Sequence, residues 1–150
     1  MKQIKSFQVN HDLIVPGTYV SRIDGDILTL DMRTRKPNND DYMDNLTMHS
    51  FEHMFATLAR FSDKSNKVIY FGPMGCQTGF YLLVRDMSLE EAHALIVQIL
   101  NEIIAYEGAV FGSTRIECGN YKNLDLKSAK DEAKRFLAAT ENQTDFNYRS

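Results

Sequence analysis

Short runs of β-forming residues alternate with polar positions in the first half of the chain. Residues 18–23 and 27–33 are two such runs around Asp24-Gly25, a dipeptide favoured in tight turns, and they predict an antiparallel hairpin. Two further strand-like runs, residues 68–71 and 77–85, lie on either side of a glycine-rich turn, and a last short strand is predicted over residues 113–118.

Apolar residues at helical spacing predict a helix over residues 46–61, after a polar loop that contains Pro37. At about 100° per residue, one side of this helix is an apolar core face made of Phe51, Met54, Leu58 and Phe61. His49 and His53 fall on the opposite side. These histidines therefore need a cover from another element or from a second subunit.

A capping box, Ser88-Leu89-Glu90-Glu91, opens a second long helix that extends to about Tyr106 and is stopped by Gly108. A third helix is expected over residues 128–139, followed by a polar tail, residues 140–150, which we expect to be mobile. Strands and helices in this order favour an α+β fold, with an antiparallel sheet and helices packed on one face. No linker interrupts the chain, so residues 1–150 are expected to form a single domain.

The charge balance argues against two classes of partner. Net charge is −3, with 17 basic and 20 acidic residues spread along the chain, which provides no basic surface for nucleic acid or an anionic membrane. No apolar run approaches a signal peptide or a membrane span, so we expect a cytoplasmic protein. In that reducing compartment, Cys76 and Cys118 are expected as a ligand, a reactive thiol or core residues rather than a disulfide.

The segment His49-Ser50-Phe51-Glu52-His53 carries the most informative chemistry in the chain. Residues four apart on a helix lie side by side, so the two imidazoles can bind one metal ion with the Glu52 carboxylate next to them. A catalytic ion normally takes three protein ligands and keeps one position open. Apart from acidic residues, the candidates for the third ligand are His11, His93, Cys76 and Cys118.

Two other classes of protein use a similar histidine pair. A metallopeptidase with this motif would activate water through Glu52, but it would need a distal acidic ligand and would give Cys76 no task. A structural or sensing metal site would normally be closed by a fourth protein ligand. The number of protein ligands therefore separates a catalytic site from a structural one.

Several motifs together resemble one family, LuxS, the S-ribosylhomocysteine lyases. In family order, the chain carries Ser6-Phe7 with His11, Asp31-Met32-Arg33 followed by Pro37-Asn38, His49-Ser50-Phe51-Glu52-His53, Pro73-Met74-Gly75-Cys76-Gln77-Thr78-Gly79-Phe80-Tyr81, and Cys118-Gly119. The resemblance covers residues 4–139. It implies conversion of S-ribosylhomocysteine to homocysteine and 4,5-dihydroxy-2,3-pentanedione, the precursor of a quorum-sensing signal, by proton shifts followed by β-elimination.

The resemblance also implies roles for individual residues. His49, His53 and Cys118 would hold the metal, usually Fe²⁺ in this family, with Zn²⁺ or Co²⁺ as possible substitutes. Glu52 and Cys76 would carry protons. The implied substrate-binding residues, near the substrate or the subunit contact, are Ser6, His11, Arg33 and Arg60. The family resemblance further implies a homodimer with two equivalent sites at the interface.

One departure from the family pattern concerns the amino group of the substrate. Many members carry an acidic residue a few positions before Pro-Met-Gly-Cys, whereas residues 67–72 of this chain contain none. Tyr70 or backbone carbonyl groups are the candidates to replace it.

Overall fold

The computed structural model describes residues 2–150 as an α+β fold built on one antiparallel sheet. Its strands are β1 (Gly17–Asp24), β2 (Ile27–Arg33), β3 (Val68–Pro73) and β4 (Gly79–Arg85). Their spatial order is β1-β2-β4-β3, so the predicted hairpin supplies one edge and the centre of the sheet. Both predicted pairs of strands are therefore confirmed, with small differences at their ends.

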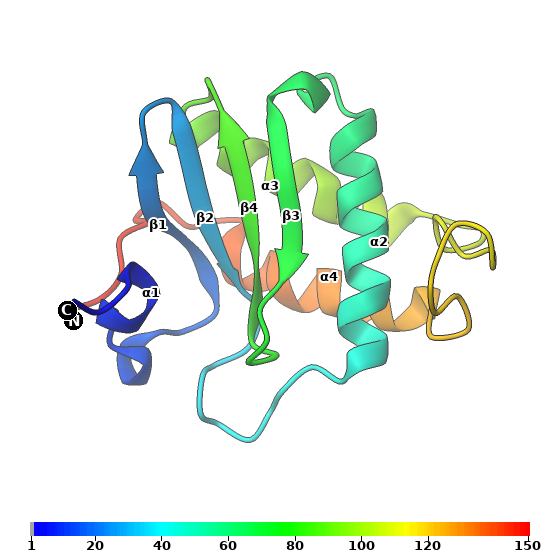
Figure 1. The fold of residues 1–150 in the computed structure, drawn as a ribbon, viewed down its shortest axis with the longest axis horizontal. Coiled ribbons are helices and arrows are strands. Elements are labelled where there is room, and N and C mark those ends of the chain that lie inside the picture. Colours follow the sequence, from blue (N-terminus) through cyan, green and yellow to red (C-terminus); the bar gives the residue numbers. More distant parts are fainter. Residues whose placement is uncertain (1) are drawn as a thin grey trace.

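Three long helices accompany the sheet, and they are α2 (Asn45–Phe61), α3 (Leu89–Ala105) and α4 (Leu126–Thr140). Shorter turns are α1 (Lys5–Gln8), η1 (His11–Leu13) and η2 (Ser65–Lys67). In Figure 1, α3 and α4 lie behind the sheet and α2 stands beside β3. No helix within residues 2–150 is both long enough and apolar enough to cross a membrane.

The two faces of the sheet have different environments. Leu28, Leu30 and Met32 of β2 point to the helices and belong to the core. Because successive side chains on a strand alternate between faces, Asp31 and Arg33 lie on the face away from this core. Both are nevertheless buried, so another part of the chain must cover them.

Aromatic side chains join α2 to the sheet. Phe51 of α2 packs 4.8 Å from Phe80 of β4, and Phe55 packs 4.3 Å from Phe71 of β3, measured between ring centroids. Full burial of each ring contributes on the order of 2 kcal/mol. This packing fixes the rotation of α2 about its axis and so decides where His49 and His53 point.

The capping box of Ser88 and Glu91 is confirmed at the start of α3. Two other predictions were wrong. Phe61, assigned to the core face of the first long helix, is 76% exposed because it is the last residue of α2. Residues 113–118 form turns rather than a strand, since Thr114 bonds locally, accepting from the backbone N–H groups of Glu117 and Cys118.

The polar tail predicted over residues 140–150 lies against β1. The backbone N–H of Val20 donates to the carbonyl oxygen of Phe146 at 2.8 Å, and the Gln143 side chain bonds to both backbone groups of Thr18. Tyr148 stacks on Tyr19. The end of the chain thus covers part of the sheet face that carries Asp31, near α1 (Figure 1).

Candidate active site

Three potential metal ligands converge beside α2. His49, His53 and Cys118 each offer one donor atom, and these atoms lie within 4.8 Å of one another. Cys118 Sγ is 3.4 Å from His49 Nε2 and 3.8 Å from His53 Nε2. Metal bonds of about 2.0–2.3 Å at tetrahedral angles separate neighbouring donors by roughly 3.3–3.6 Å. The cluster is therefore close to the dimensions of a divalent metal site.

Backbone carbonyl groups orient both imidazoles. His49 Nδ1 lies 2.8 Å from the carbonyl oxygen of Asn123, and His53 Nδ1 lies 2.8 Å from that of Phe111. A carbonyl oxygen only accepts, so each Nδ1 must carry the hydrogen. Each Nε2 is then a free lone pair directed at the cluster, which is the arrangement that metal-binding histidines usually show.

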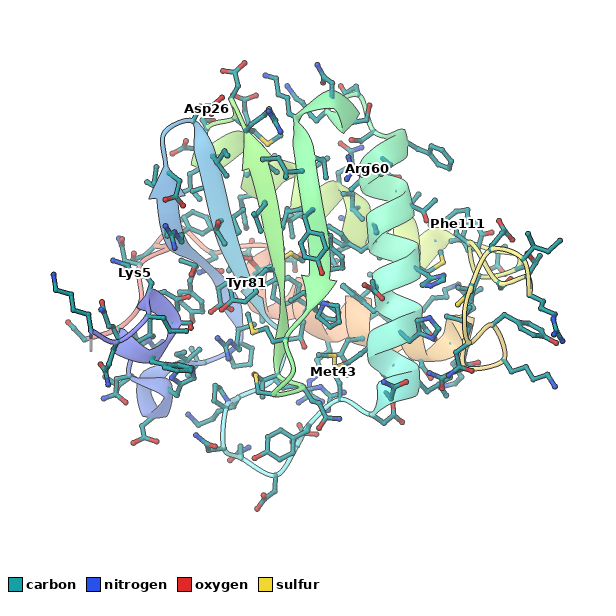
Figure 2. The ribbon with its side chains drawn as sticks, in the orientation of Figure 1. Lys5, Asp26, Met43, Arg60, Tyr81 and Phe111 are labelled. Atoms are coloured by element: carbon teal, nitrogen blue, oxygen red, sulfur yellow. The ribbon has the colours of Figure 1, made fainter. Side chains whose placement is uncertain are left out.

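The cover that the histidines require comes from the same chain. The irregular segment between α3 and α4 folds over α2, and Figure 2 shows Phe111 on this segment beside α2. It supplies Cys118, whose sulfur accepts a hydrogen bond from the backbone N–H of Asn120. Gly112 permits the close approach, because it has φ +67° and a Cβ there would lie 3.1 Å from His53 Nδ1.

Glu52 stands between two hollows next to the cluster. It lines a hollow of about 220 Å³ with His49, Asn120 and Pro73, and a second hollow with His53. Its carboxylate is half-buried. Pro73 ends β3 three residues before Cys76, so the same strand end connects the surroundings of Glu52 with those of the thiol.

Cys76 lies in the tight turn between β3 and β4. Gln77, directly after it, has φ +66°, an uncommon conformation for a residue other than glycine. Hydrogen bonds hold this turn, because Gln77 Nε2 donates to the carbonyl oxygen of Met43 at 2.9 Å and Met43 N donates back to that of Gln77 at 3.0 Å. Strain that is stabilised in this way often marks a functional position.

Arg33 and Thr78 approach the thiol. Thr78 Oγ1 is 3.0 Å from Cys76 Sγ and accepts a hydrogen bond of 2.9 Å from Arg33. Burial disfavours the charged guanidinium, but hydrogen bonds and negative charge from Asp31 outweigh it, so the pKa of Arg33 is raised. A permanent positive charge therefore lies behind the thiol.

The structure brings some of the predicted substrate-binding residues together and leaves others apart. His11 and Arg33 line one cavity of about 320 Å³ with Cys76, and Pro37, Asn38 and Tyr42 of the preceding loop complete it. Ser6, on α1, is not among the residues that line this cavity. Arg60 is eight residues beyond Glu52, about 12 Å along α2, where it donates to the carbonyl oxygens of Val68 and Ile69. Figure 2 shows Arg60 and Met43 at opposite ends of this helix.

Comparison with known proteins agrees with this geometry. The sequence model of the family described as S-ribosylhomocysteinase (LuxS) matches residues 4–147. The chain belongs to the LuxS family. Proteins named S-ribosylhomocysteine lyase are similar to it over almost their whole lengths. The one from Finegoldia magna is 42% identical over 95% of this chain and 94% of the relative, and that from Clostridium beijerinckii is 40% identical over 91% and 90%. A relative from Borreliella burgdorferi is 38% identical over 95% and 94%.

Tyr70 lies on β3, in the segment 67–72 that contains no acidic residue. Its ring leans forward along the strand, where a Cβ at Gly72 would collide with the phenol group. The side chain is 53% exposed. Because residue 72 is a glycine, the Tyr70 phenol group fits beside it and stays accessible. This phenol group lies near the C-terminal end of β3, the strand that leads into the turn with Cys76.

Sequence reasoning missed several residues that shape this LuxS site. Asp31 and Thr78 were quoted only as parts of motifs, and Tyr148 was assigned to the tail. Asp31 had a usable signal, because period-two alternation places it on the same sheet face as Arg33. The carbonyl partners of the histidines had none, since any residue can supply a backbone carbonyl.

Proposed function

We propose that this chain is an S-ribosylhomocysteine lyase, a carbon–sulfur lyase that releases homocysteine and 4,5-dihydroxy-2,3-pentanedione. The observation that carries the proposal is the three-donor cluster of His49, His53 and Cys118 with Glu52 beside it, in a chain of the LuxS family. Among the His, Cys, Asp and Glu side chains of residues 2–150, three form this cluster and no fourth joins it. An open coordination position favours catalysis over a structural site.

His49, His53 and Cys118 would hold Fe²⁺, as the family resemblance implies, and Zn²⁺ or Co²⁺ would fit the same donors. A bound ion would supply Lewis acidity toward a sugar oxygen, which acidifies the neighbouring C–H bond. The donor chemistry supports this choice, because two neutral imidazoles and a thiolate suit these divalent ions. Metal binding requires Cys118 as a thiolate, and the backbone N–H of Asn120 donates to its sulfur.

Cys76 and Glu52 would move the protons. In each isomerisation, a base removes a proton from the carbon beside the carbonyl, and an acid returns one to the former carbonyl carbon. Cys76 would act as this base and acid, because the Arg33 guanidinium is held close to its sulfur through Thr78. Glu52 would act as the second proton carrier. In the last step a base takes a proton from the carbon next to the carbonyl, the electron pair left behind forms a C=C bond, and the C–S bond breaks. The sulfur takes up a proton and departs as homocysteine, and the enol that remains tautomerises to the dione.

Substrate recognition would use the cavity next to Cys76. Arg33 and His11 line it: the Arg33 guanidinium offers donors to the hydroxyl groups of the opened sugar, and His11 Nε2 offers an acceptor, because His11 Nδ1 bonds to the carbonyl oxygen of Val9 at 2.9 Å. Ser6 and Arg60 would contribute at the subunit contact. Tyr70 would replace the missing acidic residue by accepting a hydrogen bond from the substrate's amino group.

The lyase would act as a homodimer with both sites at the interface, in the cytoplasm, where free thiols such as Cys76 and Cys118 survive. Support for a dimer comes from the sheet face opposite the core. Tyr81 and Leu83 alternate with buried residues of β4 and are only half-buried, and Tyr70 pairs with Leu83 on the same face. An exposed face of this kind is typical of an interface between subunits.

The test is direct. Protein purified without oxygen and loaded with Fe²⁺ is incubated with S-ribosylhomocysteine, and free homocysteine thiol is measured over time. We expect release by the wild type and a large loss in Glu52→Ala. The control variant Glu102→Ala, which changes a partly exposed glutamate on α3, should retain activity. No release from folded, iron-loaded wild type would refute the proposal.

A further inference from the structure

The end of the chain is attached along β1 by a series of contacts. The Gln143 side chain accepts from Thr18 N at 2.8 Å and donates to Thr18 O at 2.6 Å. Three residues later, the carbonyl oxygen of Phe146 accepts from Val20 N at 2.8 Å. This pairing places Tyr148 over the outer face of the sheet, where its ring stacks on Tyr19 with 5.1 Å between centroids.

Tyr148 forms a hydrogen bond with Asp31, the carboxylate that also pairs with Arg33. Its hydroxyl donates to Asp31 Oδ2 at 2.6 Å. Asp31 is 1% exposed, and its two oxygens accept from the Arg33 guanidinium at 3.1 and 2.6 Å. The tail therefore covers the Asp31–Arg33 ion pair from water. It also holds the Asp31 carboxylate in the orientation that accepts both hydrogen bonds from Arg33.

The chain of contacts continues to the thiol. The third nitrogen of the Arg33 guanidinium, Nη1, donates to Thr78 Oγ1 at 2.9 Å, and Thr78 Oγ1 is 3.0 Å from Cys76 Sγ. Tyr148 is thus connected to Cys76 through three side chains, although 72 positions separate them in the sequence. The match to the family model ends at residue 147, so Tyr148 lies just beyond it.

The charged and titratable groups around the thiol are few. Arg33, Asp31 and Tyr81 come from the sheet, His11 from the N-terminal segment and Tyr42 from the loop before α2, while Tyr148 reaches Asp31 from the tail. Burial, followed by the negative charge of Asp31, strongly raises the pKa of Tyr148. The phenol therefore keeps its hydrogen and remains a donor at neutral pH.

We propose that Tyr148 is a positioning residue of the Cys76 site, which it controls through Asp31 and Arg33. The hydrogen bond from Tyr148 reduces the negative charge that Asp31 presents to Arg33. It also fixes the direction of the guanidinium. More of the positive charge of Arg33 is then available to a thiolate at Cys76. The inference rests on the proposed lyase function for its role in turnover, but its effect on the thiol is measurable separately.

The test is Tyr148→Phe in the full chain, because phenylalanine retains the stacking on Tyr19 and removes only the hydroxyl. The rate at which iodoacetamide alkylates Cys76 is measured from pH 5 to 10, and peptide mass spectrometry separates Cys76 from Cys118. Since thiolate is the reacting form, we expect half-maximal reactivity to move to higher pH and the rate at pH 7 to fall about threefold or more. In the lyase assay, kcat should fall while KM changes little.

Tyr106→Phe is the matched control. Its hydroxyl also donates a short hydrogen bond, 2.6 Å to the carbonyl oxygen of Ala109, but it is part of the segment after α3 rather than of the sheet. This variant should keep the wild-type alkylation profile. An unchanged profile in Tyr148→Phe, or an equal shift in both variants, overturns the positioning role.

The two proposals fail in different ways. If the wild type releases no homocysteine but Tyr148→Phe still shifts the alkylation profile, the lyase function is refuted and the control of the thiol stands. If the wild type is active and the profile of Tyr148→Phe is unchanged, the lyase function stands and the positioning role is refuted. Sedimentation of the two variants and of the wild type shows whether a shifted alkylation profile accompanies loss of a dimer. A shift that appears together with loss of the dimer would also count against the positioning role.

Discussion

His49 Nδ1 lies 2.8 Å from the carbonyl oxygen of Asn123, a residue 74 positions further along the chain. The contact ties α2 to the segment that carries Cys118, and it fixes the imidazole tautomer that leaves Nε2 free. His53 makes the same type of contact with Phe111 at 2.8 Å. Two backbone carbonyls therefore orient the imidazoles of the ligand set.

Loss of one ligand should remove the metal. We expect His49→Gln to lower the metal content of the purified protein at least tenfold, because two remaining donors are too few for a stable site. Metal content is measured by mass spectrometry after dialysis. His93→Gln is the matched control, since His93 Nε2 also bonds to a backbone carbonyl, that of Thr140 at 2.7 Å, away from the cluster. Equal metal loss in both variants would contradict the assignment.

The thiol of Cys76 should be needed for turnover and not for the metal. Cys76→Ala removes the proposed proton carrier and leaves His49, His53 and Cys118 untouched, so we expect normal metal content and a loss of kcat of about 10²-fold or more. Homocysteine release and metal content are measured on the same preparation. A variant with near-normal turnover would exclude Cys76 as a proton carrier.

The sequence predicted well those elements that local signals specify. The helix that begins at Ser88 was predictable because a capping box and helical spacing agree there. The β1–β2 hairpin followed from Asp24-Gly25, and Gly25 indeed takes φ +61°. The position of the histidines on α2, away from Phe51 and Met54, followed from periodicity.

Long-range contacts could not be predicted in the same way. The segment after α3 has no regular structure, and Ile116, inside the strand predicted over residues 113–118, is 98% exposed. The tail showed only a polar composition, whereas its attachment depends on backbone groups of Thr18 and Val20. Arg60 remains a predicted substrate or interface residue, because a single chain shows only its bonds to β3.

A buried ion pair should stabilise the loop that lines the Cys76 cavity. Glu132 of α4 is 2% exposed and accepts two hydrogen bonds from Arg35, which also pairs with Asp41. Glu132→Ala leaves Arg35 largely desolvated without its main partner, so we expect a loss of about 2–4 kcal/mol in the free energy of unfolding. Urea denaturation measures it.

The neighbouring residue on the same helix is the control. Asp131 forms an exposed pair with Lys127 at 2.8 Å, and exposed pairs contribute little. Asp131→Ala should leave the free energy of unfolding almost unchanged. Similar losses of unfolding free energy in both variants would mean that burial of the Arg35–Glu132 pair adds no stability.

Asp125 should make stability depend on pH. It caps α4, and hydrogen bonds from Ser128 hold the pKa of its carboxyl below the usual value. Because the folded pKa is lower than the unfolded pKa of about 3.9, the stabilisation is complete above that pH and is lost as pH falls through the folded value. Asparagine caps helices equally well without titrating. Asp125→Asn should therefore match the wild type at pH 7 in urea denaturation and lose less stability as pH falls below about 4. Equal losses of stability in the variant and the wild type at low pH would refute this contribution of Asp125.

Gly112 should be required for metal binding rather than only for folding. At φ +67°, alanine costs on the order of 1 kcal/mol, and the new Cβ would lie 3.1 Å from His53 Nδ1, which must shift or lose its bond to Phe111. Gly25 provides a matched control, because it has φ +61° and nothing within 4 Å of a Cβ. Both alanine variants should be destabilised by similar amounts in urea, but Gly112→Ala alone should bind Zn²⁺ more weakly, by about tenfold or more in a competition titration with a chelator. Equal Zn²⁺ affinity in the two variants would show that the approach of Gly112 to His53 is not needed to hold the imidazole in place.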